Sequence, residues 1–539
     1  MIILYNAKVH TLDFNYPSAS ALAIDQGRIL ALGSDQEILA RFGGVGQANQ
    51  RLYNLEGRVI IPGLTDAHIH LEHYALGLQK VDCETATQVE CLERVARRAR
   101  TTPAGSWVLG HGWNQNNWLE GFGDPTDLDR TVPDHPVFLT AKSLHAAWAN
   151  ATALRLASIT ANTPDPPDGR LSRDAHGNPT GLLFESAMEL VYAVIPEPTV
   201  EEVAEAIHTA QNSLWRVGLT GVHDFDRRRC FRALQSLHRR GVLQLRVIKS
   251  IPLEDLQHAA ALGLHTGFGD DFLRIGSVKA FSDGALGPQT AAMLQPYEGN
   301  NGGRGMLFMD AEDLFEKGRL AVENGLSLAV HAIGDRANHE VLTAYANLRH
   351  HEETLPGWTA AGDTRLRHRI EHVQLIHPDD AGRLAELGVV ASMQPIHATS
   401  DMRMADRFWG ERAAFSYAWR NQLQHGARLA FGSDAPVESP NPFWGLHAAV
   451  TRRSADGAPG PNGWYPDQRL DVIDALRGFT TGAAYAGGQE DRLGQLAPTY
   501  LADLLVLDTD PFTCEPEQLR DIQPRATMVG GDWVYSELA

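Results

Sequence analysis

Four short apolar runs lie in the centre of the chain: LRIGSVKAFSDG (273–284), LSLAVHAIGD (326–335), RHRIEHVQL (367–375) and GVVASMQP (388–395). Segments with a helical period separate them, and two of these, AEDLFEKGRLAVENG (311–325) and HPDDAGRLAELG (377–388), end on glycine, which is typical of a helix terminus. Near-continuous apolar strands that alternate with amphipathic helices indicate a parallel sheet covered by helices.

Four further runs of the same kind extend the pattern in both directions: IIPGLTDAHIH (60–70), TGVHDF (220–225), LQLRVIKSI (243–251) and ARLAFGSDAP (427–436). Eight such strands predict an α/β fold of the (β/α)8 TIM barrel type, whose active site lies at the carboxyl ends of the strands. We place the barrel domain at residues 61–489. The long interval after the first strand predicts a large inserted subdomain, at residues 75–200, over the mouth of the barrel.

Both ends of the chain are rich in β-strand signals. ILYNAKVHTL (3–12) and RVIIPG (58–63) mix aliphatic and polar residues near the start, and ADLLVLD (502–508) and RATMVGGDWVY (525–535) do so near the end. We therefore expect residues 1–60 and 490–539 to form one composite β-sandwich.

The composition limits the classes of partner. With 47 Lys+Arg against 66 Asp+Glu among 539 residues, the formal charge of −19 argues against nucleic acid and anionic membranes. The sequence contains neither a run long enough for a membrane helix nor a recognisable signal peptide, and its four cysteines have no metal-binding spacing. We expect a cytoplasmic protein that acts on a small molecule.

Residues able to bind a metal ion follow the predicted strands. His68 and His70 alternate at the end of the first strand, so both imidazoles can face one ion. Four other candidates occur at later strands, namely Lys279, His331, His372 and Asp434. Each alone has a simpler interpretation, as a core histidine, a paired lysine or a helix-capping aspartate. Their joint occurrence at the active-site ends of the strands favours a metal centre.

Lys279 lies inside an apolar strand, where a charged ammonium group is costly unless it is paired or chemically changed. Addition of CO2 to the neutral amine would give a carbamate, an anionic ligand able to bridge two ions. Imidazole and carboxylate ligands suit zinc, manganese, iron or cobalt, so the residue types alone do not select the metal.

The sequence resembles the amidohydrolase superfamily, in the branch of the N-substituted formamide deformylase-like metal-dependent hydrolases (amidohydrolase family 3). The resemblance covers nearly the whole chain. It is carried by these motifs: IIPGLTDAHIHL (60–71), VKAFSDGALGPQTAAML (278–294), VHAIGDRAN (330–338), RIEHVQ (369–374), the segment from MQPIHATSD (393–401) to GSDAPVESPNP (432–442), and ADLLVLDTDPF (502–512).

The resemblance implies a hydrolase that uses a divalent metal, zinc above all, to cleave an amide-type C–N bond other than a peptide bond. It implies that His68, His70 and Asp434 bind one ion, that His331 and His372 bind a second, and that carbamylated Lys279 bridges the two in a binuclear metal centre. A mononuclear site with unmodified Lys279 stays open. A metal-activated hydroxide would attack the substrate, with Asp434 as general base and acid.

Four residues are candidates for the substrate pocket. By the resemblance, Trp113 and His145 belong to insert segments that approach the site, although Ser143-Leu144 stands where the family has Asp-Gly. Trp113 is equally explained as a core aromatic of the insert. Asp283 and Gln394 lie near strand ends, and Asp283-Gly284 also suits a simple turn.

Two other functions are possible for this fold. A mononuclear deaminase-type aminohydrolase would need a glutamate where this chain has Gly334, and it would give Lys279 no role. A non-catalytic protein like the exoenzyme regulators is disfavoured because all six ligand positions are retained. Neither the substrate nor the oligomeric state follows from the sequence, although homodimers are common among such barrels.

Overall fold

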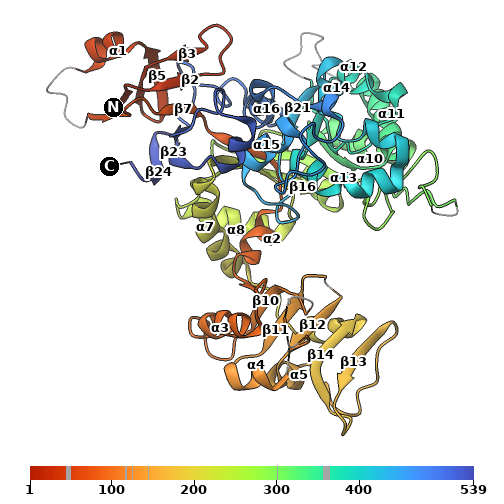
Figure 1. The fold of residues 1–539 in the computed structure, drawn as a ribbon. Helices are drawn as coiled ribbons and strands as arrows, with labels where there is room; N and C mark the ends of the chain where they lie inside the picture. Colours follow the sequence, from red (N-terminus) through yellow and green to blue (C-terminus); the bar gives the residue numbers. More distant parts are fainter. Residues whose placement is uncertain are drawn as a thin grey trace. The chain divides into compact units, whose positions relative to one another are not determined.

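The computed structural model describes residues 1–43, 50–115, 118–119, 121–123, 125–143, 145–299, 302–355 and 365–538 (Figure 1). The chain separates into two compact units, Met1–Tyr74 with Ile207–Ala539, and Ala75–Ala206. Among the residues just given, none of the helices has the length and apolar character needed to cross a bilayer.

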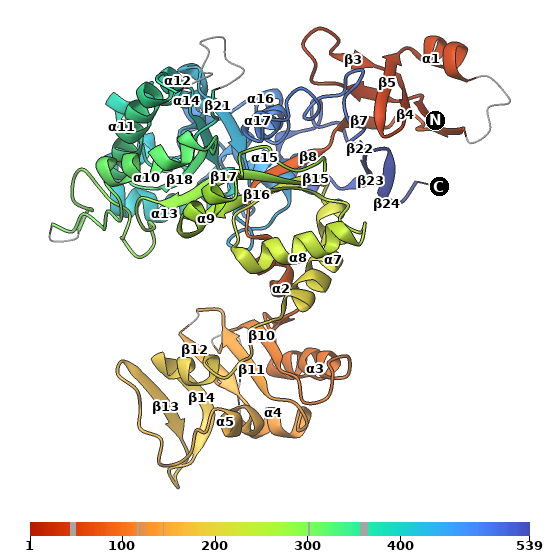
Figure 2. The same cartoon turned by 180° about the vertical axis from the view of Figure 1, so that it is seen from behind.

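The first unit contains an eight-stranded parallel sheet that is nearly closed (Figure 2). Each of the eight predicted apolar runs coincides with one strand of this sheet to within a few residues, and a bridge between Ile69 and Ala435 links the first strand to the last. The predicted TIM barrel is thereby confirmed. Its strands are β8 (Leu64–Ile69), β15 (Leu219–Asp224), β16 (Arg246–Pro252), β17 (Leu273–Phe281), β18 (Leu328–Ala332), β19 (Arg369–His372), β20 (Val390–Met393) and β21 (Arg428–Phe431).

Helices on the outside of the barrel begin and end where the sequence provides caps. In α10 (Ala311–Glu323) the Asp310 side chain accepts a hydrogen bond from the Asp313 amide, which satisfies a backbone donor in the first turn. Gly325 then takes a positive φ of 68°, which suits a residue without Cβ, and the chain turns into β18. The following helix, α11 (Asp335–Glu352), leads to β19.

Both ends of the chain contribute to two sheets that share one apolar core. One sheet has the order β5–β4–β1–β6, and the other has the order β24–β23–β22–β7–β2–β3. The amino-terminal strand β7 (Val59–Pro62) pairs antiparallel with the carboxyl-terminal strand β22 (Leu504–Leu507), which joins the two ends. Leu4, Ile24, Ile60, Leu504 and Met528 are among the shared core residues, and this composite β-sandwich is confirmed. The remaining strands are β1 (Ile2–Tyr5), β2 (Lys8–His10), β3 (Ser18–Ala19), β4 (Ala21–Asp25), β5 (Arg28–Gly33), β6 (Arg51–Asn54), β23 (Pro524–Val529) and β24 (Asp532–Ser536).

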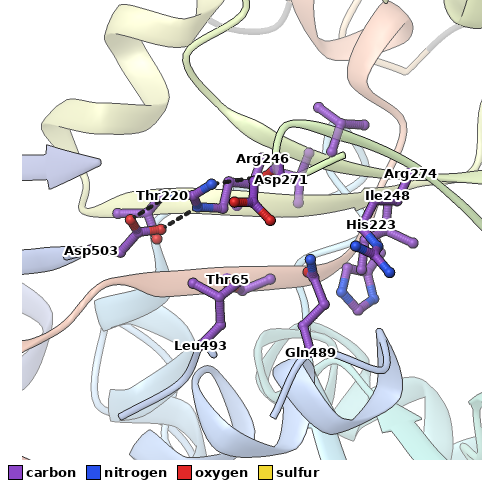
Figure 3. A pocket seen from close by; sticks show the side chains of 13 residues that line it. Thr65, Thr220, His223, Arg246, Ile248, Asp271, Arg274, Gln489, Leu493 and Asp503 are labelled. Atoms are coloured by element: carbon purple, nitrogen blue, oxygen red, sulfur yellow. Dashed lines mark hydrogen bonds and ion pairs between the residues drawn. The ribbon is translucent and has the colours of Figure 1, made fainter. Parts of the chain in front are cut away.

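A buried ion pair connects the barrel to the sandwich. Arg246, at the start of β16, donates two hydrogen bonds to Asp503, which precedes β22 (Figure 3). The two residues line a cavity of about 20 Å³ together with Thr65 and Thr220, which lie near the amino-terminal ends of their strands. This end of a barrel serves stability, whereas the chemistry lies at the opposite end.

The second unit, Ala75–Ala206, is the predicted large insert after the first barrel strand. It contains a six-stranded sheet with its own core, which includes Cys83, Val108, Leu139 and Trp148. The domain bounds predicted from the sequence, 1–60 with 490–539 for the sandwich, 61–489 for the barrel and 75–200 for the insert, stay a prediction. The strands of the sheet are β9 (Val81–Asp82), β10 (Val108–Trp113), β11 (Val137–Ala141), β12 (Ala146–Ala149), β13 (Gly169–Arg173) and β14 (Pro179–Glu185).

Candidate metal centre

The barrel brings all six predicted ligand residues to one cavity of about 420 Å³. His68 is the penultimate residue of β8 and His70 directly follows that strand, while Lys279 lies in β17. His331 is in β18, His372 closes β19, and Asp434 follows β21. The residues converge because the strands are parallel, so that their carboxyl ends surround a single opening. They are His68, His70, Lys279, His331, His372 and Asp434.

Asp434 lies between the two histidines of the first strand. Its Oδ1 is 3.6 Å from His68 Nε2 and 3.4 Å from His70 Nε2. Ligand atoms of His68, His372 and Asp434 all lie within 4.8 Å of one another. The His331 ring centre is 4.6 Å from that of His372, so the fifth and sixth strands place a second pair of imidazoles beside the first. The donor set fits one or two divalent ions.

The backbone is strained at two of these positions. His372 has a φ of 78° and Asp434 a φ of 60°, a region that residues with a Cβ seldom adopt. Such strain is typical of functional sites, where the surrounding structure holds a side chain in a required direction.

Each imidazole has one ring nitrogen held by a hydrogen-bond acceptor, which leaves the other nitrogen for a metal ion. His68 Nδ1 donates to Glu371 Oε2 over 2.5 Å, and His70 Nδ1 donates to Asp226 Oδ1 over 3.0 Å. The remaining two bonds are His372 Nδ1 to Gln394 Oε1, at 2.8 Å, and His331 Nε2 to the Gly284 carbonyl, at 2.9 Å. This arrangement is the usual one around catalytic metals.

Comparison with known proteins agrees with this geometry. The model of the amidohydrolase family matches residues 51–535. The chain belongs to the amidohydrolase family. It is 30% identical to the N-substituted formamide deformylase of Arthrobacter pascens, over 98% of this chain and 97% of that protein. It is 33% identical to protein LONG AFTER FAR-RED 3 of Arabidopsis thaliana, over 99% of this chain and 91% of that protein.

A solved structure from Pyrococcus horikoshii, described as an uncharacterized metal-dependent hydrolase, superposes with a TM-score of 0.76. It is 29% identical, and the alignment covers 96% of this chain and 99% of that one. The predicted family and the predicted class, a hydrolase of C–N bonds other than peptide bonds, are confirmed. The relatives and the ligand set together support a divalent metal in this family member.

Burial keeps three of the imidazoles uncharged. Desolvation, reinforced by Lys279, lowers the pKa of His68 to about 4 and that of His331 to about 3. Desolvation also lowers the pKa of His372 well below its usual range. All three rings are therefore neutral near pH 7, the form that binds a metal ion. Burial opposes the charged form of His70 as well, but hydrogen bonds to Asp226 and Asp434 raise its pKa to about 9.

Lys279 is buried among aromatic rings. Its Nζ lies 4.5 Å from the ring centre of Phe225 and 5.0 Å from that of Phe281. Desolvation lowers the pKa of Lys279 to about 8, although Glu371 and Asp434 act in the opposite direction. A larger fraction of neutral amine is therefore present than for a lysine in water.

Sequence reasoning missed three residues that surround the ligands. Glu371 supports His68, Asp226 supports His70, and His397 Nε2 lies 3.4 Å from Asp434 Oδ2. Asp226 lies just beyond the end of one strand, in TGVHDFD (220–226), and Glu371 lies at the end of another, in RIEH (369–372). Acidic residues at strand ends were therefore the signal in the sequence that could have identified them. His397 lies in the first turn of α13 (Pro395–Trp409), directly after β20.

The four predicted pocket residues have different surroundings. Trp113 lies in the core of the insert, where its indole N–H donates to the Leu139 carbonyl, and His145 is exposed beside Glu185. Asp283 accepts hydrogen bonds from the amides of three residues, Ala292, Ile333 and Gly334, and so fixes the loops after β17 and β18. Gln394 holds His372. Neither Asp283 nor Gln394 is among the described residues that line the cavity.

Proposed function

We propose that this protein hydrolyses an amide-type C–N bond of a small molecule at a binuclear metal centre, with zinc as the metal. The observation that carries the proposal is the convergence of four imidazoles, one carboxylate and Lys279 on one cavity, each imidazole being held at its other nitrogen. A cavity of about 420 Å³ suits a small substrate.

The residues divide into two sets of ligands. His68, His70 and Asp434 would hold one ion, His331 and His372 would hold the other, and a CO2-derived carbamate on Lys279 would bridge them. The position of Lys279, 5% exposed and on the same cavity as the five other ligands, supports this role. Paired divalent ions supply Lewis acidity and lower the pKa of water to roughly 7.

Asp434 is placed to move the proton. Its Oδ1 faces His68 and His70, whereas its Oδ2 faces His397. Oδ2 can therefore accept the proton of the attacking water and return it to the nitrogen of the leaving group. His397 Nε2 orients this carboxylate, and the apolar cavity residues Phe281, Leu286 and Ile333 limit the access of bulk water.

We expect zinc-loaded protein to hydrolyse at least one member of a panel of N-substituted formamides, N-acyl amino acids and cyclic imides, all of which are cleaved at a C–N bond. Removal of the metal with a chelator should abolish the activity, because the ions supply the Lewis acidity, and added zinc should restore it. Product formation is followed by mass spectrometry. Hydrolysis that persists undiminished in chelated, metal-free protein would contradict the proposal.

A further inference from the structure

The cavity has two chemically different walls. The end of β17 and the loops after β17 and β18 form an apolar wall of Phe281, Ala285, Leu286 and Ile333. On the side of β19, β20 and β21 the cavity is lined by Gln374, Asp401 and Glu438, which we call the acidic wall, together with His397, Met404 and Val437. Lys279 is the one lysine or arginine among the described residues that line the cavity.

No lysine or arginine of the described residues pairs with the two carboxylates of the acidic wall, and the nearby positive group on this side of the cavity is His397. No ion pair among the described residues includes Asp401 or Glu438. Asp401 Oδ2 accepts a hydrogen bond from the Tyr417 hydroxyl over 2.5 Å. Tyr417 also donates its backbone N–H to the Gln374 carbonyl, over 2.7 Å, so it joins Asp401 and Gln374 into one wall.

Gln374 provides an independent indication of a ligand. The residue is 5% exposed, and its buried side-chain oxygen Oε1 has no hydrogen-bond partner among the described residues. A buried acceptor without a partner is costly, so it indicates a donor supplied by a bound molecule. Gln374, Asp401 and Glu438 all offer acceptors, and a ligand that satisfies them must carry several N–H donors.

Burial makes a nearby positive charge more favourable for the carboxylates of Asp401 and Glu438. Desolvation raises the pKa of Glu438, and the nearby Asp401 and Asp434 carboxylates add to this effect, whereas a hydrogen bond with Ser400 and the charge of His397 oppose it. Two carboxylates in a partly buried wall repel each other, and an ammonium group placed between them would relieve that repulsion.

We propose that the substrate is an amide that carries an ammonium group, which the acidic wall binds through Asp401, Glu438 and Gln374 Oε1. The inference rests on the proposed function and specifies its substrate class. His397, which contacts Asp434, and Asp401 are four residues apart on α13 and so lie one helical turn apart on the same face. The ammonium group is therefore separated from the scissile amide by a short chain, whose methylene groups pack on the apolar wall.

The test compares two substrates of equal length, N-(4-aminobutyl)formamide and the neutral N-pentylformamide, on zinc-loaded protein. We expect kcat/KM to favour the cationic amide by about tenfold, a difference of about 1.4 kcal/mol. Asp401→Asn and Glu438→Gln should each reduce this ratio by about threefold, and the double variant should bring it close to one. Glu312→Gln, an exposed position on α10, is the matched control and should leave the ratio unchanged.

A ratio of one or less in the natural protein, or a ratio that the double variant does not change, would overturn the inference. A second readout separates it from the proposed function. Binding of butylammonium to zinc-loaded protein is measured by calorimetry, which needs no turnover. If neither formamide is hydrolysed but butylammonium binds and the double variant weakens that binding, the proposed reaction fails, whereas the assignment of the acidic wall as an ammonium site stands. Absence of butylammonium binding overturns the inference.

Discussion

Asp434→Asn is expected to lower kcat/KM for the amide substrate by about a thousandfold. An amide side chain can neither accept the proton of the attacking water nor return it to the leaving nitrogen. The substitution also removes the carboxylate whose Oδ1 lies 3.4 Å from His70 Nε2 and 3.6 Å from His68 Nε2. Steady-state kinetics on zinc-loaded protein measure the effect.

A matched control separates this loss from a general effect of removing a buried carboxylate. Asp380 is buried, lies outside the cavity and binds His339 and Arg383, so Asp380→Asn should retain its kcat/KM. If Asp434→Asn kept more than about a tenth of the natural kcat/KM, Asp434 would not be the proton carrier.

Glu371→Gln should lower both the affinity for zinc and the stability of the folded protein. Glu371 is fully buried, accepts a hydrogen bond from His68 and forms an ion pair with Arg369 over 2.5 Å. Burial opposes ionisation, but Arg369 and His68 hold the pKa of Glu371 well below its usual range. We expect zinc affinity to fall by about 10- to 100-fold and the free energy of unfolding to fall by about 3–5 kcal/mol, because the Arg369 charge is left unpaired.

Glu352→Gln is the control for this variant. Glu352 is also buried, and it pairs with His368, just before β19, and with Arg349, so its loss should destabilise the protein to a similar extent. It makes no contact with the six proposed ligands, and zinc affinity should therefore be retained. Equal loss of zinc affinity in both variants, measured by competition with a chromophoric chelator, would show that Glu371 acts only through stability.

The barrel was predictable because its strands are buried on both faces, which leaves short apolar runs in the sequence. The ligand positions were predictable because parallel strands end at one rim, so that a histidine at the end of one run must lie near a histidine at the end of the next. His331 and His372 are the clearest example, with ring centres 4.6 Å apart.

Side-chain partners across the barrel were not predictable from local pattern. The hydrogen bond from His70 to Asp226 joins strand ends that are far apart in the sequence, and the contact of His397 with Asp434 depends on how α13 starts after β20. Asp283 was a candidate for the substrate pocket because it lies near a strand end. In the structure its carboxylate instead accepts hydrogen bonds from backbone amides and so fixes two loops.

The location of bound zinc tests the central claim most directly. Crystals of the protein grown with zinc and bicarbonate, and measured with anomalous diffraction at the zinc edge, should show two peaks in the barrel cavity. We expect one peak bound by His68, His70 and Asp434, a second bound by His331 and His372, and carbamate density on Lys279 between them. A single peak beside an unmodified Lys279 would contradict the binuclear centre, and the absence of any peak at these residues would contradict the metal site itself.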